Sequence, residues 1–157
     1  MTKNRLILSF ILFSFHSFGQ HAPKELPKFM SIHDVYCPER LLQQALPKEG
    51  RIVLVFYDTG CGHCQELGTS IAKNLPRLTD VSFFFISMND REYVDGFINM
   101  FAKELKNKPR ISFWKDPGVE FLERFRPENY PATYVYDAKS KKLLRESQVG
   151  HNVYNTL

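Results

Sequence analysis

The chain has 157 residues, which is enough for one domain and too few for two. Hydrophobic residues make up 43% and charged residues 24%, and these ordinary globular proportions exclude a disordered or fibrous chain. The three cysteines are too few for a disulfide framework, and their odd number allows at most one internal disulfide with one thiol left over.

The first segment (1–19) reads as a secretory signal peptide. It starts with Lys3 and Arg5, continues as an apolar run and ends with Ser17 and Gly19, small residues at the −3 and −1 positions of a cleavage site. The alternative is an uncleaved membrane anchor, but the apolar run is shorter than the roughly 20 residues that span a bilayer. We therefore expect cleavage after Gly19.

Cleavage leaves a nearly neutral mature chain. Losing Lys3 and Arg5 lowers the net charge from +4 to +2, so nothing calls for nucleic acid or an acidic membrane surface as a partner. No later segment is apolar enough to span a bilayer, and we expect an extracytoplasmic, periplasmic protein in a compartment that permits disulfides. Residues 20–30 read as an extended lead-in, and 31–157 as the domain.

The first half of the domain predicts a helix, a strand and a second helix. Residues 38–46 form a plausible short helix with Pro38 in its first turn. Residues 51–57 are continuously apolar and rich in β-branched side chains, which indicates a strand buried on both faces. A helix follows from about residue 61, and Pro76 should kink or end it.

The second half continues the alternation of strands and helices. It predicts, in order, a buried strand over 81–87, an amphipathic helix over 90–106, a short strand over 111–114, a brief helix over 121–125, a strand over 132–136 and a final strand over 141–149. This order predicts a three-layer α/β domain with a mixed sheet that ends in a hairpin.

The chemistry is carried by Cys61-Gly62-His63-Cys64, which follows a buried strand and opens a helix. Two intervening residues let both sulfurs reach disulfide distance across one helical turn. Cys61 lies nearest the free N–H groups of the helix, which stabilise a thiolate, and His63 adds a donor or a positive charge. The motif predicts thiol–disulfide exchange in which Cys61 attacks, Cys64 resolves, and no cofactor or metal is bound.

Two structural explanations of this motif are weaker. Half of a zinc site would need a second ligand pair, whereas the remaining candidates, Cys37, His33 and His151, are scattered singly. A purely structural disulfide that closes so small a loop contributes little stability.

Cys37 is expected to be a partly buried, unpaired thiol, with regulatory or intermolecular pairing as the alternative.

A second motif, Asn129-Tyr130-Pro131-Ala132-Thr133, leads directly into a strand. On its own it reads equally well as an ordinary turn proline. Together, RIVLVFYDTGCGHC (51–64) and YPATYVYD (130–137) resemble the thioredoxin-like superfamily. The resemblance implies a cis Tyr130–Pro131 bond facing the two cysteines, where Tyr130 and Pro131 would dock an extended substrate chain.

The spacing of the two motifs narrows the resemblance to one branch of the superfamily. Pro131 follows Cys61 by 70 residues (131 − 61), and the stretch 111–144 is similar to the TlpA-like branch of extracytoplasmic thiol–disulfide oxidoreductases. This implies a three-layer α/β/α domain with an insertion between the CxxC helix and the cis-proline strand. The chain departs from minimal thioredoxins at Val55, where they carry a buried acid, and at Gly60, where they carry Trp. Asp58 is nearer to Cys61 but at a different offset.

The leading hypothesis is an exported enzyme that exchanges disulfides with protein thiols and is served by an upstream redox partner. The Gly62-His63 pair resembles that of protein disulfide isomerases and favours an oxidant or isomerase, whereas the TlpA-like passage favours a reductant. Three alternatives stay open. A peroxiredoxin-like peroxide reductase would carry Thr where Asp58 stands, a copper-delivery module would use His151 but three residues between its cysteines, and a non-catalytic interaction module would not need both cysteines.

Overall fold

The computed structural model describes residues 22–147 of the chain. The expected signal peptide (1–19) lies outside the described residues, as do His151 and the end of the expected final strand. Within the described part, no helix is both long and apolar enough to cross a membrane.

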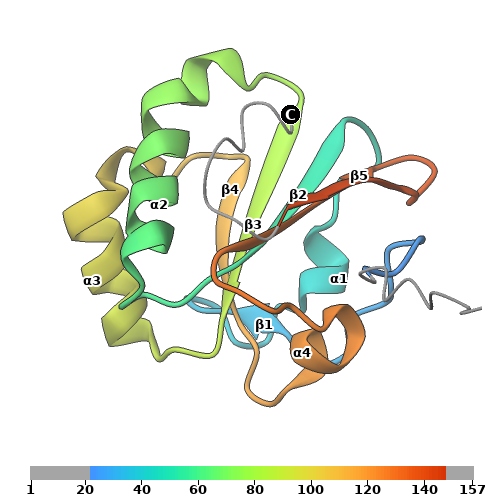
Figure 1. Cartoon of the computed structure of the whole chain (residues 1–157), viewed down its shortest axis with the longest axis horizontal. Coiled ribbons are helices and arrows are strands. Elements are labelled where there is room, and N and C mark those ends of the chain that lie inside the picture. The colour runs from blue at the N-terminus through green and yellow to red at the C-terminus, as the bar shows by residue number, and fades with distance from the viewer. Residues whose placement is uncertain (1–21, 148–157) are drawn as a thin grey trace, which may run out of the picture.

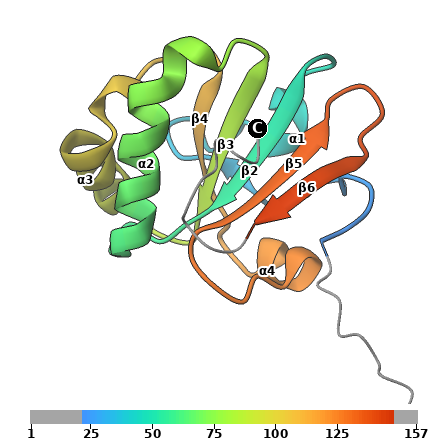
Figure 2. The same cartoon turned by 45° about the horizontal axis from the view of Figure 1, so that its top comes forward.

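Six strands form one mixed sheet in the order β1-β4-β3-β2-β5-β6 (Figures 1 and 2). Strands β2, β3 and β4 are parallel, and β1, β5 and β6 each run antiparallel to a neighbour. The strands are β1 (His33–Asp34), β2 (Arg51–Phe56), β3 (Val81–Ser87), β4 (Ile111–Lys115), β5 (Ala132–Asp137) and β6 (Leu143–Ser147). The two-residue strand β1 was not predicted from the sequence.

Helices cover both faces of the sheet, which confirms the three-layer prediction. The α-helices are α1 (Leu42–Ala45), α2 (Gly62–Asn74), α3 (Arg91–Phe101) and α4 (Glu120–Phe125), with short 3-10 turns η1 (Leu75–Arg77) and η2 (Lys103–Leu105). Helices α2 and α3 pack on one face, and α1 and α4 lie on the other (Figure 1). Between α2 and β5 the chain forms β3, α3, β4 and α4.

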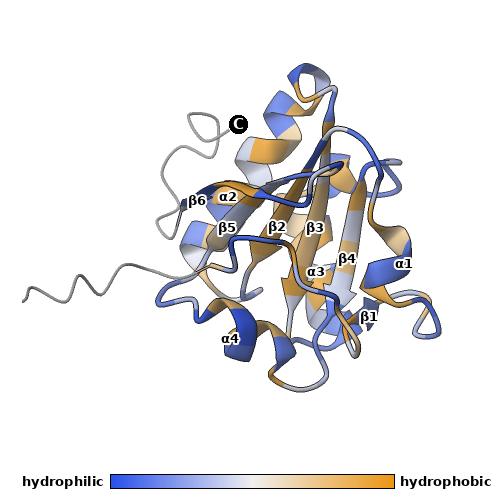
Figure 3. Cartoon of the chain, turned by 90° about the vertical axis from the view of Figure 1, so that its right-hand side faces the viewer, coloured by the Kyte–Doolittle hydropathy of each residue, from blue (hydrophilic) through white to orange (hydrophobic). Residues whose placement is uncertain are grey.

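The central strand β2 is buried on both faces, as its sequence predicts. Val53 and Val55 point into the core beneath α2 and α3, whereas Ile52 and Leu54 point into the core beneath α1 and α4. All four are fully buried, and the hydrophobic colour of the central strands in Figure 3 reflects this. Such two-sided burial holds the end of β2 in place, and the CxxC motif follows that end directly.

The expected extended lead-in is tied to the domain. Leu26 donates its backbone N–H to the carbonyl of Lys141 at 2.8 Å, and Leu26 and Phe29 are buried. The ring of Phe29 stacks on that of Phe121 in α4 at 6.4 Å. The segment therefore covers part of the sheet face on which α1 and α4 lie.

The helix predicted over 38–46 is much shorter in the structure, where it spans Leu42–Ala45. The backbone before it pairs with β1 instead. Asp34 donates its N–H to the carbonyl of Arg40 at 2.9 Å, and Leu42 donates to Ile32 at 2.9 Å. These bonds to residues 32 and 34 take backbone groups that a helix starting at Pro38 would have used.

The helix predicted over 90–106 is interrupted at Ala102. Helix α3 ends at Phe101, Ala102 has an extended φ of −141°, and η2 follows. The carbonyl of Phe101 accepts a hydrogen bond of 2.9 Å from the Thr69 hydroxyl of α2, so contact between the two helices accompanies the break. At the other end of α2, the predicted effect of Pro76 is confirmed, because the helix stops at Asn74 and gives way to η1.

Candidate active site

The CxxC motif begins at a tight turn between β2 and α2. Cys61 is the N-cap residue of α2, with φ −79° and ψ 122°, and it donates its N–H to the carbonyl of Asp58 at 3.2 Å. The Asp58 carboxylate accepts the N–H of Gly60 at 2.9 Å. This arrangement sets Cys61 at the N-terminus of a 13-residue helix, which is the positive end of the helix dipole.

The two cysteines of the motif lie in different environments. Cys61 is partly exposed, whereas Cys64 is 1% exposed and belongs to the core beneath α2 and α3. Burial raises the pKa of the Cys64 thiol far above its ordinary value, and the backbone N–H of Asp58 lowers it only in part. Both are unpaired in the structure. At neutral pH the dithiol thus combines an accessible sulfur with a protonated, protected one.

The predicted cis peptide bond between Tyr130 and Pro131 is confirmed. The Cys61 thiol donates to the Tyr130 carbonyl, with Sγ 3.7 Å from the oxygen. The antiparallel register explains this contact, because Ala132 at the start of β5 pairs with Phe56 at the end of β2. The Tyr130 ring also rests against that of Phe56 at 5.2 Å.

The two residues between the cysteines lie at the surface. The His63 side chain is 62% exposed, and its Nδ1 lies 3.5 Å from a carboxylate oxygen of Glu66. A Cβ added to Gly62 would meet no atom within 4 Å. Glu66 was missed in the sequence, although its spacing of three residues from His63 on a helix is the signal that indicates such a pair.

Asn89 is a second residue that the sequence reasoning missed. It follows β3, and its side-chain oxygen accepts the N–H of Thr59 at 3.2 Å while its amide nitrogen lies 3.4 Å from the Asp58 carboxylate. It thereby ties the turn at residues 58–60, just before Cys61, to the loop that follows β3. The available signal was its position, since the carboxyl ends of adjacent parallel strands meet at one edge of a sheet.

The structure shows the same departures from minimal thioredoxins that the sequence shows. Val55 is fully buried in the apolar core beneath α2 and α3, so no carboxylate occupies that place. Asp58 lies in the turn, and its charge raises the pKa of both Cys64 and Tyr130, although burial is the larger cause in each case.

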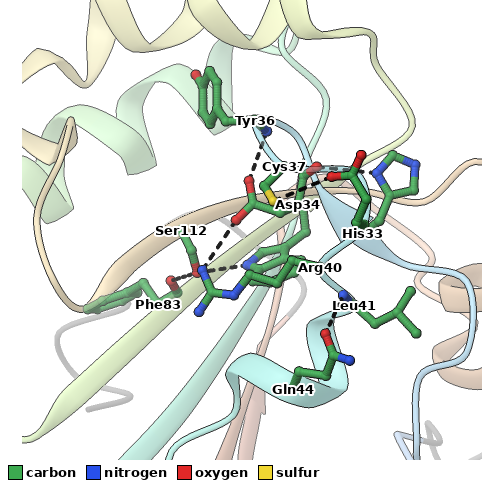
Figure 4. A network of polar contacts seen from close by, with 11 residues as sticks. His33, Asp34, Tyr36, Cys37, Arg40, Leu41, Gln44, Phe83 and Ser112 are labelled. Carbon is green, nitrogen blue, oxygen red and sulfur yellow. Dashed lines mark hydrogen bonds and ion pairs between the residues drawn. The ribbon is translucent and has the colours of Figure 1, made fainter.

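Cys37 and His33 are not brought to the motif. They belong to β1 and the turn after it, and β4 and β3 lie between β1 and β2. Cys37 is exposed rather than partly buried, and its thiol donates to the Glu39 carboxylate at 3.6 Å (Figure 4). Among residues 22–147, no group of three or more His, Cys, Asp or Glu could hold a metal ion.

No model of a known protein family matches the sequence, and no curated protein matches it. Solved structures do share the fold. A secreted Mycobacterium tuberculosis disulfide oxidoreductase homologous to Escherichia coli DsbE aligns with a TM-score of 0.58 and 17% identity, over 74% of this chain and 80% of that one. A thioredoxin-like protein from Aeropyrum pernix aligns with a TM-score of 0.60 and 13% identity, over 74% and 78%.

A yeast mitochondrial 1-Cys peroxiredoxin also aligns, with a TM-score of 0.66 and 16% identity, over 87% of this chain and 72% of that one. At such identities the shared feature is the fold. The chain has the thioredoxin-like α/β fold that these solved structures share.

Proposed function

We propose that the chain is an exported thiol–disulfide oxidoreductase that exchanges disulfides with protein thiols through Cys61 and Cys64. The observation that carries this proposal is the contact between the partly exposed Cys61 Sγ and the Tyr130 carbonyl, 3.7 Å apart, with the buried Cys64 one helical turn behind. A sulfur at a helix N-terminus, beside an exposed tyrosine and a strand entry, is accessible to an extended polypeptide.

The exchange takes place in two balanced steps. The Cys61 thiolate attacks a substrate disulfide, forming a Cys61–substrate bond while the second substrate sulfur leaves with the electron pair and gains a proton. Cys64 then loses its proton and attacks Cys61 Sγ, so that the Cys61–Cys64 disulfide forms and the remaining substrate sulfur leaves as a thiol. The substrate gains two electrons and the motif loses two. Oxidation of a substrate runs the same steps in reverse.

The test is reduction of insulin disulfides by dithiothreitol with the purified chain as catalyst. Wild-type protein and Cys37→Ser should accelerate insulin precipitation equally, whereas Cys61→Ser should be inactive. A titration of thiols before and after oxidation should show the loss of two thiols in both active proteins. Equal rates with and without the wild-type protein would contradict the proposal.

Peroxide reduction is a second candidate only because a peroxiredoxin shares the fold. Asp58 stands where that chemistry would place Thr, so we favour disulfide exchange. Consumption of hydrogen peroxide by the reduced protein, compared with its reduction of insulin, separates the two activities.

Export is part of the same proposal, with residues 1–19 as the signal peptide. Expression of the full chain in a bacterium followed by fractionation should place the protein outside the cytoplasm with Gln20 as its first residue. The reduction potential of the Cys61–Cys64 pair then assigns its direction. Known CxxC pairs cover about 150 mV, and about 30 mV corresponds to a tenfold change in equilibrium, so equilibration with glutathione separates a reductant from an oxidant or isomerase.

A further inference from the structure

Gly60, the residue directly before Cys61, is exposed in the turn that leads from β2 into α2. Glycine has the most conformational freedom of any residue, and it offers no side chain that could pack and hold the backbone. A mobile backbone at this point would let the Cys61 Sγ move away from the Tyr130 carbonyl, which lies 3.7 Å from it. The turn therefore depends on hydrogen bonds to keep its place.

Two of these hydrogen bonds lie within the turn. The Asp58 carboxylate accepts the N–H of Gly60 at 2.9 Å, and the Asp58 carbonyl accepts the N–H of Cys61 at 3.2 Å. Both bonds are local, so they fix the shape of residues 58–61. They do not fix where the turn lies relative to the sheet and the helix on either side of it.

Two side-chain amides from outside the turn bond to the backbone of Thr59. Asn89, in the loop after β3, accepts the Thr59 N–H with its side-chain oxygen at 3.2 Å, and its amide nitrogen lies 3.4 Å from the Asp58 carboxylate. Gln65 of α2 donates its side-chain N–H to the Thr59 carbonyl at 3.1 Å. The two peptide groups that flank Thr59 are thus held from opposite sides. We call the side chains of Gln65 and Asn89 the amide clamp.

Gln65 also connects the turn to the helix that carries both sulfurs. It follows Cys64 directly, and its own backbone N–H donates to the carbonyl of Cys61 at 3.1 Å. One residue therefore bonds to the backbone on both sides of Gly60. Gln65 and Asn89 are partly buried, so their hydrogen bonds are partly shielded from water.

We propose that Gln65 and Asn89 are positioning residues that hold the Cys61 Sγ beside the Tyr130 carbonyl, where a docked polypeptide would present its disulfide. Each acts through the backbone of Thr59, to which it bonds, and the exchange of thiol and disulfide proceeds as described above. A nucleophile that is held in place beside a docked substrate loses less freedom on the way to the transition state. The clamp should therefore matter for a substrate that docks on residues 130–131 and not for a small disulfide. This inference rests on the proposed disulfide exchange.

The experiment compares two disulfides in a Cys37→Ser background, so that only the motif cysteines react. Reduced protein is mixed with insulin in a single turnover that is stopped by acid, or with Ellman's reagent, whose first thionitrobenzoate reports attack by Cys61. Gln65→Met keeps the length and helix propensity of the side chain but cannot donate. This variant and Asn89→Ala should each slow insulin reduction about tenfold or more and leave the rate with Ellman's reagent within about twofold of the background protein.

The matched control is Asn74→Ala. The Asn74 amide donates to the Ser70 carbonyl at 3.0 Å, a bond of the same kind, but at the end of α2 far from the motif. This variant should keep the background rates with both disulfides. Urea unfolding checks that each variant is folded in the assay. Because Gln65 and Asn89 belong to different elements, either variant tests the inference if the other does not fold.

The ratio of the two rates decides the outcome, and each residue is judged by its own variant. A loss that is confined to insulin supports the inference, because a variant that is merely less stable loses activity with both disulfides. Equal losses with both disulfides, or no loss with either, overturn it. A background protein that reacts with Ellman's reagent but does not reduce insulin contradicts the proposed function itself, which separates that failure from a failure of the inference.

Discussion

The Sγ of Cys61 lies 3.7 Å from the carbonyl oxygen of Tyr130, although 69 residues separate the two in the chain. The contact depends on the pairing of β2 with β5, which sets the entry to β5 beside the N-terminus of α2. A substrate chain that reached Cys61 would meet the backbone of residues 130–131 at the same time. In the proposed exchange, the attacking sulfur and the docking surface are therefore parts of one arrangement.

Cys61 should be the first thiol of the motif to react. Burial raises the pKa of Cys64 and keeps it protonated, whereas Cys61 is partly exposed at the helix N-terminus. Iodoacetamide at mildly acidic pH, followed by peptide mass spectrometry, should label Cys61 well before Cys64 or Cys37. Cys64 should become reactive after unfolding in urea. Fastest labelling at Cys37, an exposed thiol outside the motif, would argue against Cys61 as the nucleophile.

His63→Pro should make the motif more reducing. We expect the imidazole to favour the thiolate and hence the reduced state, so its loss should lower the reduction potential of the Cys61–Cys64 pair by roughly 20–40 mV, where about 30 mV corresponds to about 1.4 kcal/mol. Proline fits the structure, because position 63 is in the first turn of α2, where the N–H has no partner within the helix. The measurement is equilibration with glutathione. His33→Ala, a histidine change in β1, serves as the control, and an unchanged potential in His63→Pro would remove His63 from the mechanism.

Pro131→Ala should reduce disulfide exchange while leaving both thiols titratable. Alanine adds a backbone N–H and conformational freedom next to the Tyr130 carbonyl that contacts Cys61. We expect a loss of about tenfold or more in the insulin assay, by analogy with other misplaced docking groups. Pro117→Ala, in the turn before α4, should retain activity. Full activity of Pro131→Ala would show that this proline is not part of the docking surface.

Glu120 should make stability dependent on pH. Burial opposes its ionisation, but hydrogen bonds from Ser31 and Met30 and the charge of Arg124 outweigh burial and lower its pKa. The stabilisation is therefore present above the unfolded pKa of about 4.3 and is lost as pH falls through the lower folded value.

Glu120→Gln should consequently lower the free energy of unfolding by about 1–2 kcal/mol at pH 7, with a smaller difference at pH 3. Urea unfolding at both pH values is the measurement. Glu123→Gln, an exposed change on the same helix, should stay within about 0.5 kcal/mol of wild type. A deficit in Glu120→Gln that does not shrink at low pH would point to packing rather than charge.

Much of this arrangement follows from the sequence because it is local. The β-branched run at 51–57 predicts the central strand, and helical spacing after Cys61 with a proline at position 76 predicts the extent of α2. The cis bond at Pro131 was predicted from resemblance to thioredoxin-like proteins, because a sequence pattern by itself does not set the isomer of a peptide bond.

The ends of two helices and the residues that meet at the site were decided by tertiary contacts, which local sequence patterns do not encode. The helix predicted over 38–46 is shortened because its first residues bond to β1, and the helix predicted over 90–106 is broken where Phe101 accepts from Thr69. Strand order also decides which residues reach the turn before Cys61. It brings Asn89 into contact with that turn and keeps Cys37 away from it. Periodicity in a sequence records which side chains are buried, whereas hydrogen bonds between distant segments determine which residues meet at a site.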